Sequence, residues 1–244
     1  LVFPDEVVAE AKAIPQELAP EDYKDRADLR EQCVVTIDGK DAHDFDDAVS
    51  GTKLGEGYEI TVSIADVTHY VKPTHPLDDE ARNRSTSIYV ADRVVPMLPF
   101  ELSNGICSLN PNVDRLVLSV VMDLDPMGNV FHSEIKQGVI RSHGRLNYDE
   151  VNDFFAGKDV PELSKEIKDT LTLLHEASIA VRKRRERQGA MRLDSTELKF
   201  QLDENGDQTS VTKVVQGPSE KMIEDLMILA NVEVAKQLKN AGDP

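Results

Sequence analysis

Five aspartates lie within the ten residues from Asp38 to Asp47, directly after a β-branched run that predicts a strand. Two carboxylates about 5 Å apart repel each other by roughly 0.8 kcal/mol even in water, and by more near a partly buried surface. Any fold of this chain therefore has to bring cations to the segment or leave it in solvent. If its last residues are extended, Asp44 and Asp46 share one face and Asp47 points across the strand, while Asp38 reaches the same place through the turn at Gly39.

The chemistry of this segment leaves two interpretations open. Clustered carboxylates suit magnesium or manganese rather than zinc. A calcium loop of the EF-hand type is excluded, because counting from Asp38 puts Lys40 and Ala42 at ligand positions. His43 and Asp44 form a pair of the kind found in metal phosphohydrolases, but no second histidine pair accompanies it. The segment is then either a solvated acidic turn or a two-metal phosphodiesterase site, in which carboxylates hold cations that activate water.

The pattern of apolar, capping and turn-forming residues predicts an α+β fold with a mixed, largely antiparallel sheet and packed helices. Turn-rich breaks at 125–129 and 203–207 predict two antiparallel hairpins. The mostly charged stretch 21–30 is typical of a solvated helix or a linker. The expected helices cover 5–14, 148–155, 161–187 and 220–238, with another opening at 76–82, and the expected strands cover 33–37, 58–67, 116–124, 130–140, 198–202 and 211–215.

Charge and cysteine content narrow the class of protein. Lys and Arg contribute 28 positive charges against 45 negative charges from Asp and Glu, a net charge of −17. Spread evenly, this charge argues against a nucleic-acid binder, but cations bound at the aspartate segment would reverse the local field. The two cysteines, Cys33 and Cys107, are too few for a disulfide framework or a zinc knuckle, which favours a reducing compartment. The sequence has no apolar run of membrane-spanning length and no signal peptide, so we expect a cytoplasmic protein without a membrane partner.

The aspartate segment resembles a known motif. Residues 36–48, TIDGKDAHDFDDA, are similar to the active-site signature of the RNB family of exoribonucleases. Further similar stretches are IADVTHYV at 64–71, ARNRSTSIY at 81–89, VPMLP at 95–99 and LSNGICSLN at 102–110. The similarity runs along essentially the whole chain, and it is nearer to the ribonuclease R branch of the family than to ribonuclease II.

The resemblance implies a hydrolytic, processive 3′→5′ exoribonuclease that acts on the 3′ end of single-stranded RNA, releases nucleoside 5′-monophosphates and has no preference for DNA. It also implies a magnesium-dependent site with two metal ions, at which manganese could replace magnesium. Position by position, Asp38, Asp44, Asp46 and Asp47 match the four family aspartates of the catalytic metal site, whereas Asp41 lies outside that set. We expect loss of Asp46 to abolish turnover while sparing RNA binding, because a carboxylate that positions the nucleophile acts in the transition state.

Three further positions match family residues that contact RNA. Tyr89 matches a tyrosine that packs near the 3′-terminal nucleotide, where an aromatic face accepts every base. Tyr148 and Glu224 match positions that hold the sugar edge, through which RNA is distinguished from DNA. By residue type alone, Tyr89 is an ordinary strand tyrosine and Glu224 a solvated helix residue. The basic run 182–187 fits a solvated helix end as well as a phosphate contact.

Two departures from the family pattern affect the expected activity. Leu193 stands where the family places a phenylalanine that stacks on the terminal base, which weakens the base clamp. The family's Pro-Ile-Arg-Arg stretch, whose arginine contacts the scissile phosphate, and its flanking OB-fold RNA-binding domains do not occur in this sequence. We therefore expect 1–244 to be a partial RNB catalytic domain, with lead-in helices over 1–32, the N-terminal and central part over 33–244 and the C-terminal part absent. Such a piece of a longer polypeptide is expected to degrade RNA weakly or not at all by itself.

A function of a different class stays open on the residues. A non-catalytic acidic domain that binds divalent cations or a basic protein partner would show the same aspartate cluster and the same net charge. It predicts metal binding without any dependence on RNA, whereas exonuclease activity in a longer chain would exclude it.

Overall fold

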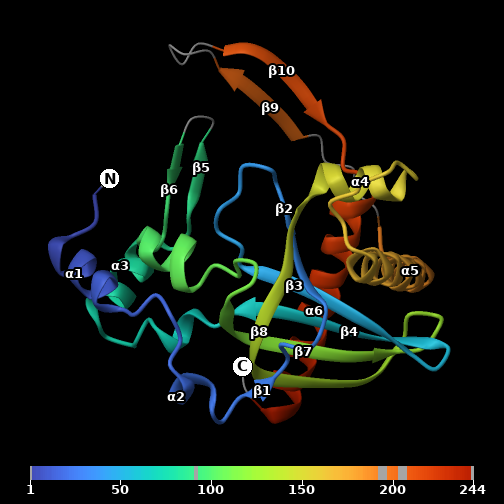
Figure 1. Ribbon diagram of the computed structural model, residues 1–244, viewed down its shortest axis with the longest axis horizontal. Coiled ribbons are helices and arrows are strands. Elements are labelled where there is room, and N and C mark those ends of the chain that lie inside the picture. Colours follow the sequence, from blue (N-terminus) through green and yellow to red (C-terminus); the bar gives the residue numbers. More distant parts are fainter. Residues whose placement is uncertain (1, 91–92, 192–196, 203–207, 243–244) are drawn as a thin grey trace.

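A six-stranded sheet forms the centre of the structure, and the expected α+β class is confirmed (Figure 1). The computed structural model describes residues 2–90, 93–191, 197–202 and 208–242. The strands of the sheet are β1 (Ala27–Asp28), β2 (Val34–Asp38), β3 (Asp47–Leu54), β4 (Gly57–Ala65), β7 (Asp114–Leu124) and β8 (Val130–Asn147). They lie in the order β1-β8-β2-β3-β4-β7; β8 is parallel to β1 and β2, and the other neighbours are antiparallel.

Strand β8 belongs to two parts of the sheet at once. Its first part, as far as Arg141, pairs antiparallel with β7, and its last part, from Ser142 to Asn147, pairs in parallel with β2. The sheet therefore curves back on itself. The hairpin predicted between β7 and β8 is confirmed, and at its turn the Asp125 side chain accepts hydrogen bonds from the backbone N–H groups of Met127 and Asn129.

Alternating side chains of the strands face two separate apolar cores. Val49 and Val62 face the first core, which packs the sheet against α4 (Tyr148–Phe155), α5 (Lys165–Arg187) and α6 (Pro218–Ala241). Ala48 and Ala65 face the second core, which contains α1 (Asp5–Ala13), α3 (Pro76–Arg84) and the short helical segment η2 (Glu101–Ile106). Figure 1 shows the two groups of helices on opposite sides of the strands.

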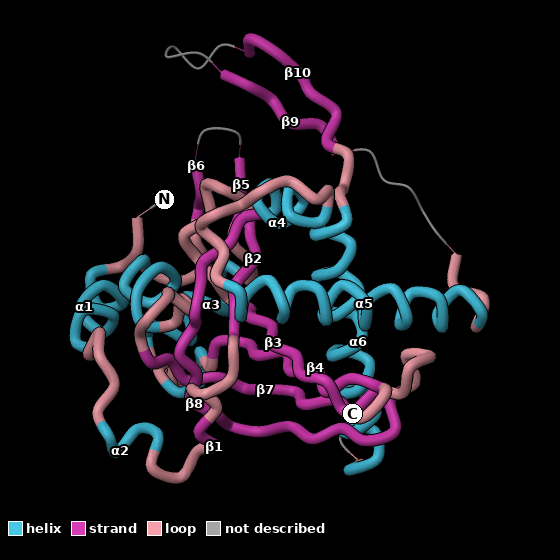
Figure 2. The backbone as a smooth tube through the Cα atoms, turned by 45° about the vertical axis from the view of Figure 1, so that its right-hand side comes forward, coloured by secondary structure: helices cyan, strands magenta, loops and turns pink. Residues whose placement is uncertain are grey.

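Two small antiparallel hairpins extend from the main body on the side where β2 ends (Figures 1 and 2). The first joins β5 (Ile88–Val90) to β6 (Arg93–Val95), and the second joins β9 (Glu197–Leu202) to β10 (Gln208–Val214). The second confirms the hairpin predicted around 203–207, although these turn residues lie outside the described part of the chain.

The predicted start of the longest expected helix is wrong by four residues. Helix α5 begins at Lys165 rather than at 161, because the Ser164 hydroxyl oxygen accepts a hydrogen bond from the N–H of Ile167 and caps the helix there. None of the helices in the described ranges is both long and apolar enough to cross a membrane.

Two other predicted segments are divided in the structure. The strand expected over 58–67 ends at Ala65, and a 3-10 turn, η1 (Val67–His69), follows it. The charged stretch 21–30 contains the end of the short helix α2 (Pro20–Tyr23) and strand β1, rather than one continuous helix or a linker.

Candidate active site

The four matched aspartates lie at the end of β2, in the loop that follows and at the start of β3. Asp38 is the last residue of β2 and Asp47 the first of β3, while Asp44 and Asp46 belong to the connection. Strands β2 and β3 pair at a single register position, Val35 with Val49, so the ladder does not extend to the strand ends that carry the carboxylates.

The pKa values show that these carboxylates act on one another. Burial raises the pKa of Asp38 to about 7, and the charges of Asp47, Asp44 and Asp46 add to that shift. Partial removal from water, together with the charges of Asp44 and Asp47, raises the pKa of Asp46 to about 6. Burial also raises the pKa of Asp47. The structure therefore brings the four side chains into one electrostatic cluster, which a cation would stabilise.

The residues present fit a hard divalent cation. One carboxylate oxygen of Asp38, Oδ2, is buried without a hydrogen-bond partner, which is costly unless something else satisfies it. Four carboxylates supply the oxygen ligands that magnesium and manganese prefer. Within the described part of the chain, no three His, Cys, Asp or Glu side chains already form a group that could hold a metal ion. The cluster is thus a group of carboxylates that act on one another and that have the oxygen chemistry such an ion prefers.

The loop between β2 and β3 is anchored by Phe45 and by one serine. Phe45 is 2% exposed and packs into the second core, so its neighbours Asp44 and Asp46 point the other way. The Ser108 hydroxyl donates to the carbonyl of His43 at 3.0 Å and accepts from the N–H of Phe45 at 3.1 Å. A single buried side chain thus holds the backbone on both sides of Asp44.

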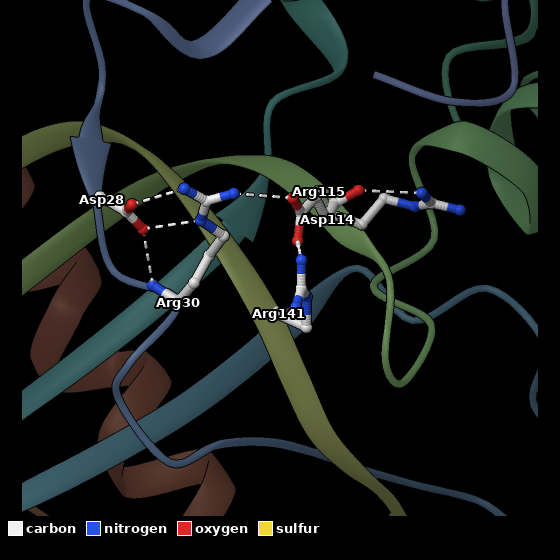
Figure 3. A network of polar contacts seen from close by, with 5 residues as sticks. All are labelled: Asp28, Arg30, Asp114, Arg115 and Arg141. Atoms are coloured by element: carbon white, nitrogen blue, oxygen red, sulfur yellow. Dashed lines mark hydrogen bonds and ion pairs between the residues drawn. The ribbon is translucent and has the colours of Figure 1, made fainter. Parts of the chain in front are cut away.

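Ser108 is in turn held by a buried arginine. Arg115 donates from Nε to the Ser108 carbonyl at 2.9 Å and from Nη2 to the Gly105 carbonyl at 3.3 Å. Its neighbour Asp114 accepts from Arg30 at 2.9 Å and from Arg141 at 2.8 Å (Figure 3). This network joins the start of β7 to β8 and to the segment after β1. Through Ser108 and Arg115 it connects the loop between β2 and β3, residues 39–46, to the sheet, and we call this segment the aspartate loop.

Both tyrosines matched by sequence lie beside the cluster. Tyr89, on β5, is 63% exposed, and its hydroxyl donates to Asp44 Oδ2 at 2.5 Å. That hydrogen bond is the main reason why the pKa of Tyr89 is raised to about 12. Tyr148, the first residue of α4, has its pKa raised to about 12 by burial and by the charges of Asp38, Asp47 and Glu220.

Glu224 and its neighbour Asp225 have different environments on α6. Glu224 is exposed, whereas the Asp225 side chain is 6% exposed and accepts hydrogen bonds from Arg182 Nε at 2.7 Å and Arg185 Nη1 at 2.9 Å. The structure thus makes Asp225 a link between α5 and α6 and leaves Glu224 available for a ligand.

The basic run 182–187 makes contacts within the fold. Besides the two arginines that pair with Asp225, Arg184 donates to the Gly128 carbonyl at 2.9 Å and Arg187 to the Met127 carbonyl at 3.1 Å. These contacts attach the end of α5 to the β7–β8 turn. Leu193, the other position singled out by sequence, lies outside the described residues.

Comparison with known proteins decides the family. The profile of the RNB domain matches residues 26–244. The chain belongs to the RNB family. Ribonuclease R of Thermotoga maritima is 45% identical over 244 residues, which are 99% of this chain and 34% of that protein. Ribonuclease R of Escherichia coli is 39% identical over 245 residues, which are 100% of this chain and 30% of that protein. The chain thus spans about a third of the length of these RNB relatives.

Solved structures of other proteins have the same fold. RNase R of Mycoplasma genitalium, in complex with ribose-methylated single-stranded RNA, matches with a TM-score of 0.95 at 31% identity over 99% of this chain and 38% of that chain. Yeast Ssd1, described as a pseudonuclease, matches with a TM-score of 0.72 at 18% identity over 93% of this chain and 28% of that chain. Since a pseudonuclease shares the RNB fold, activity has to be argued from the site residues and not from the fold.

Sequence reasoning missed two residues that shape this RNB site, Ser108 and Arg145. Arg145, on β8, donates from Nη2 to the carbonyls of Lys40 and Ala42 at 2.8 and 2.9 Å. Ser108 lies in a stretch that resembles the family, but no local pattern indicates its contacts, because they are 63 and 65 residues away along the chain.

Proposed function

We propose that this chain is part of the catalytic domain of a magnesium-dependent, hydrolytic 3′→5′ exoribonuclease that shortens single-stranded RNA processively and releases nucleoside 5′-monophosphates. The observation that supports the proposal is the electrostatic cluster of four carboxylates. Asp38 has a buried oxygen without a hydrogen-bond partner, and Asp44 accepts a hydrogen bond from the exposed Tyr89. Family membership and RNA-bound relatives support it.

In this proposal Asp38, Asp44, Asp46 and Asp47 hold two magnesium or manganese ions. When bound, such ions activate a water molecule and stabilise the leaving oxygen of a phosphodiester. The carboxylates are prepared for this role because their mutual repulsion and desolvation are relieved only by positive charge or by protons. Asp46 fixes the position of the attacking group, so its charge matters more in the transition state than in RNA binding.

The two tyrosines and Glu224 position the RNA end. Tyr89 offers an exposed ring next to Asp44, on which a terminal base of any identity stacks. Tyr148, next to Asp38 and Asp47, and Glu224, one turn along α6 from Glu220, contact the sugar edge and its 2′-hydroxyl.

Part of this proposal concerns the longer enzyme to which the chain would belong. Residues 33–244 form the N-terminal and central part of an RNB catalytic domain and 1–32 lead into it. The parent enzyme works in the cytoplasm and takes much of its grip on RNA from OB-fold domains outside this chain. By itself the chain degrades RNA weakly or not at all.

Replacement of Asp46 tests the proposal most directly. A chimera in which this chain replaces the corresponding third of the Thermotoga maritima enzyme should shorten a 5′-labelled single-stranded RNA stepwise in magnesium, as followed on sequencing gels. Asp46→Asn in that chimera should slow shortening by about a hundredfold or more, while fluorescence anisotropy reports unchanged RNA affinity. A folded chimera without activity, or an Asp46→Asn chimera that still shortens RNA at the original rate, would overturn the proposal.

A second candidate function is that of a non-catalytic domain that binds divalent cations or a basic protein. Two observations favour it: a pseudonuclease has the same fold, and the net charge of −17 suits a basic partner. Manganese binding by the isolated chain, combined with an inactive but folded chimera, would support this second function.

A further inference from the structure

Arg145 contacts the aspartate loop from strand β8. It lies on the part of β8 that runs parallel to β2, where it is in register with Thr36, and Asn147 is in register with Asp38. From this position its Nη2 reaches two carbonyls of the loop, those of Lys40 and Ala42. The guanidinium carbon also lies 5.0 Å from the centre of the Phe45 ring.

Arg145 contacts the aspartate loop at Lys40 and Ala42, where strands β2 and β3 do not pair. The backbone turns at Gly39, whose carbonyl accepts from the N–H of Ala42 at 3.0 Å, and then continues towards Asp44. Ser108 holds the loop on the side of His43 and Phe45, while Arg145 holds the turn before them. The aspartate loop is therefore held by Arg145 at Lys40 and Ala42 and by Ser108 on both sides of Asp44.

The positive charge of Arg145 and its hydrogen bonds to the loop have opposite expected effects on metal binding. Arg145 lies close enough to Asp38 to lower the pKa of that carboxyl, whereas the neighbouring aspartates raise it. By electrostatics alone, a guanidinium repels a divalent cation, so its removal would strengthen metal binding. If the hydrogen bonds to the loop matter more, its removal weakens metal binding, because the ligands lose their relative positions.

We propose that Arg145 is a positioning residue of the metal site, which holds the loop after Asp38 so that the aspartates on it converge with Asp38 on a divalent cation. The inference rests on the proposed function, since it assumes that the cluster binds metal. A lysine cannot replace it, because its side chain is shorter than that of arginine and lacks the planar guanidinium, which lies over Phe45 while its Nη2 donates to both carbonyls.

The test measures the affinity of the 244-residue chain for Mn²⁺, with free Mn²⁺ followed by electron paramagnetic resonance. Arg145→Gln should weaken binding by about tenfold or more, and Arg145→Lys should remain close to Arg145→Gln. Arg82→Gln is the control: Arg82 is an exposed arginine on α3 that bonds to Asp78 on the same helix, and its replacement should leave Mn²⁺ affinity unchanged. Hydrogen exchange without metal should show faster exchange of the Ala42 amide in Arg145→Gln only.

The outcomes separate the inference from the function on which it rests. Equal or tighter Mn²⁺ binding by Arg145→Gln would overturn the positioning role, and so would full affinity in Arg145→Lys, which also serves if the glutamine variant does not fold. Asp46→Asn identifies the site: if it binds Mn²⁺ as well as the unchanged chain, the proposed metal cluster itself fails, whatever Arg145 does.

Discussion

Asp38 is the carboxylate on which most of the electrostatic strain of the site falls. It ends a buried strand, three other aspartates act on it, and one of its oxygens is buried without a partner. In the metal-free folded chain its pKa is about 7, whereas the ordinary value is 3.8. The folded state therefore keeps a proton that the unfolded chain releases between these two values.

This difference predicts how stability depends on pH without metal. Because the folded state binds more protons between about pH 4 and pH 7, the free energy of unfolding should fall as the pH rises across this range and level off above it. Thermal melts in EDTA should show a lower Tm at pH 8 than at pH 5, with a smaller difference in Asp38→Asn. Added Mg²⁺ should restore the Tm of the unchanged chain at pH 8 and not that of the variant. Equal pH slopes in the two proteins would contradict the assignment of the strain to Asp38.

What the sequence reveals at this scale depends on distance along the chain. The aspartates could be singled out because they lie within ten residues, and the structure places four of them together. Arg145 could not, because its partner Lys40 is 105 residues away and an exposed arginine near the end of a strand carries no local signal. Candidate ligands can thus be found from their spacing in the sequence, whereas the contact between Arg145 and their loop depends on strand register.

At the scale of elements, a single acidic residue links α5 and α6 by ion pairs, in addition to their apolar packing. Asp225 is buried between Arg182 and Arg185, which are themselves 25% and 31% exposed. Replacement of the carboxylate by a neutral amide leaves the guanidinium groups of Arg182 and Arg185 without their negatively charged partner on α6, although both groups still reach water.

Neighbouring acidic residues on α6 therefore make a matched pair of variants. Asp225→Asn should lower the free energy of unfolding by about 1–3 kcal/mol, as measured by urea denaturation. Glu224→Gln removes the same charge from an exposed position one residue away and should change it by less than about 0.5 kcal/mol. If both variants lose similar stability, Asp225 is not the link between the two helices.

The elements that sequence patterns found are those with a strong local signal. The β7–β8 hairpin has a clear turn at 125–129, and α4 and α5 begin with capping residues. Strand β3 was missed because Asp47–Leu54 has three buried residues in a row, an exposed end and no regular alternation. Strands β5 and β6 have three residues each, and η2 contains a non-helical residue at Gly105, so neither has a periodic pattern to detect.

On the scale of the whole molecule, a net charge of −17 opposes contact with a polyanion. At constant ionic strength, the 244-residue chain should bind single-stranded RNA weakly in EDTA. Binding should strengthen when Mg²⁺ replaces K⁺, because cations at the aspartate cluster turn repulsion of phosphate into attraction. Fluorescence anisotropy would measure it. Tight binding in EDTA that weakens steeply with added KCl would instead indicate a basic RNA-binding surface.

The two-part pairing of β8 also sets an order of assembly. Strand β2 and the loop after it are made early in synthesis, but the strand that pairs with β2 and the arginine that holds its loop come about a hundred residues later. Contacts between such distant segments form late, because a long loop has to close before they contribute any stability. A ribosome-bound chain that has not yet reached β8 contains all four aspartates. It still lacks the strand that pairs with β2 and Arg145, which contacts the loop that carries them. The nascent polypeptide, which emerges close to ribosomal RNA, thus completes the candidate metal site only when its sheet is finished.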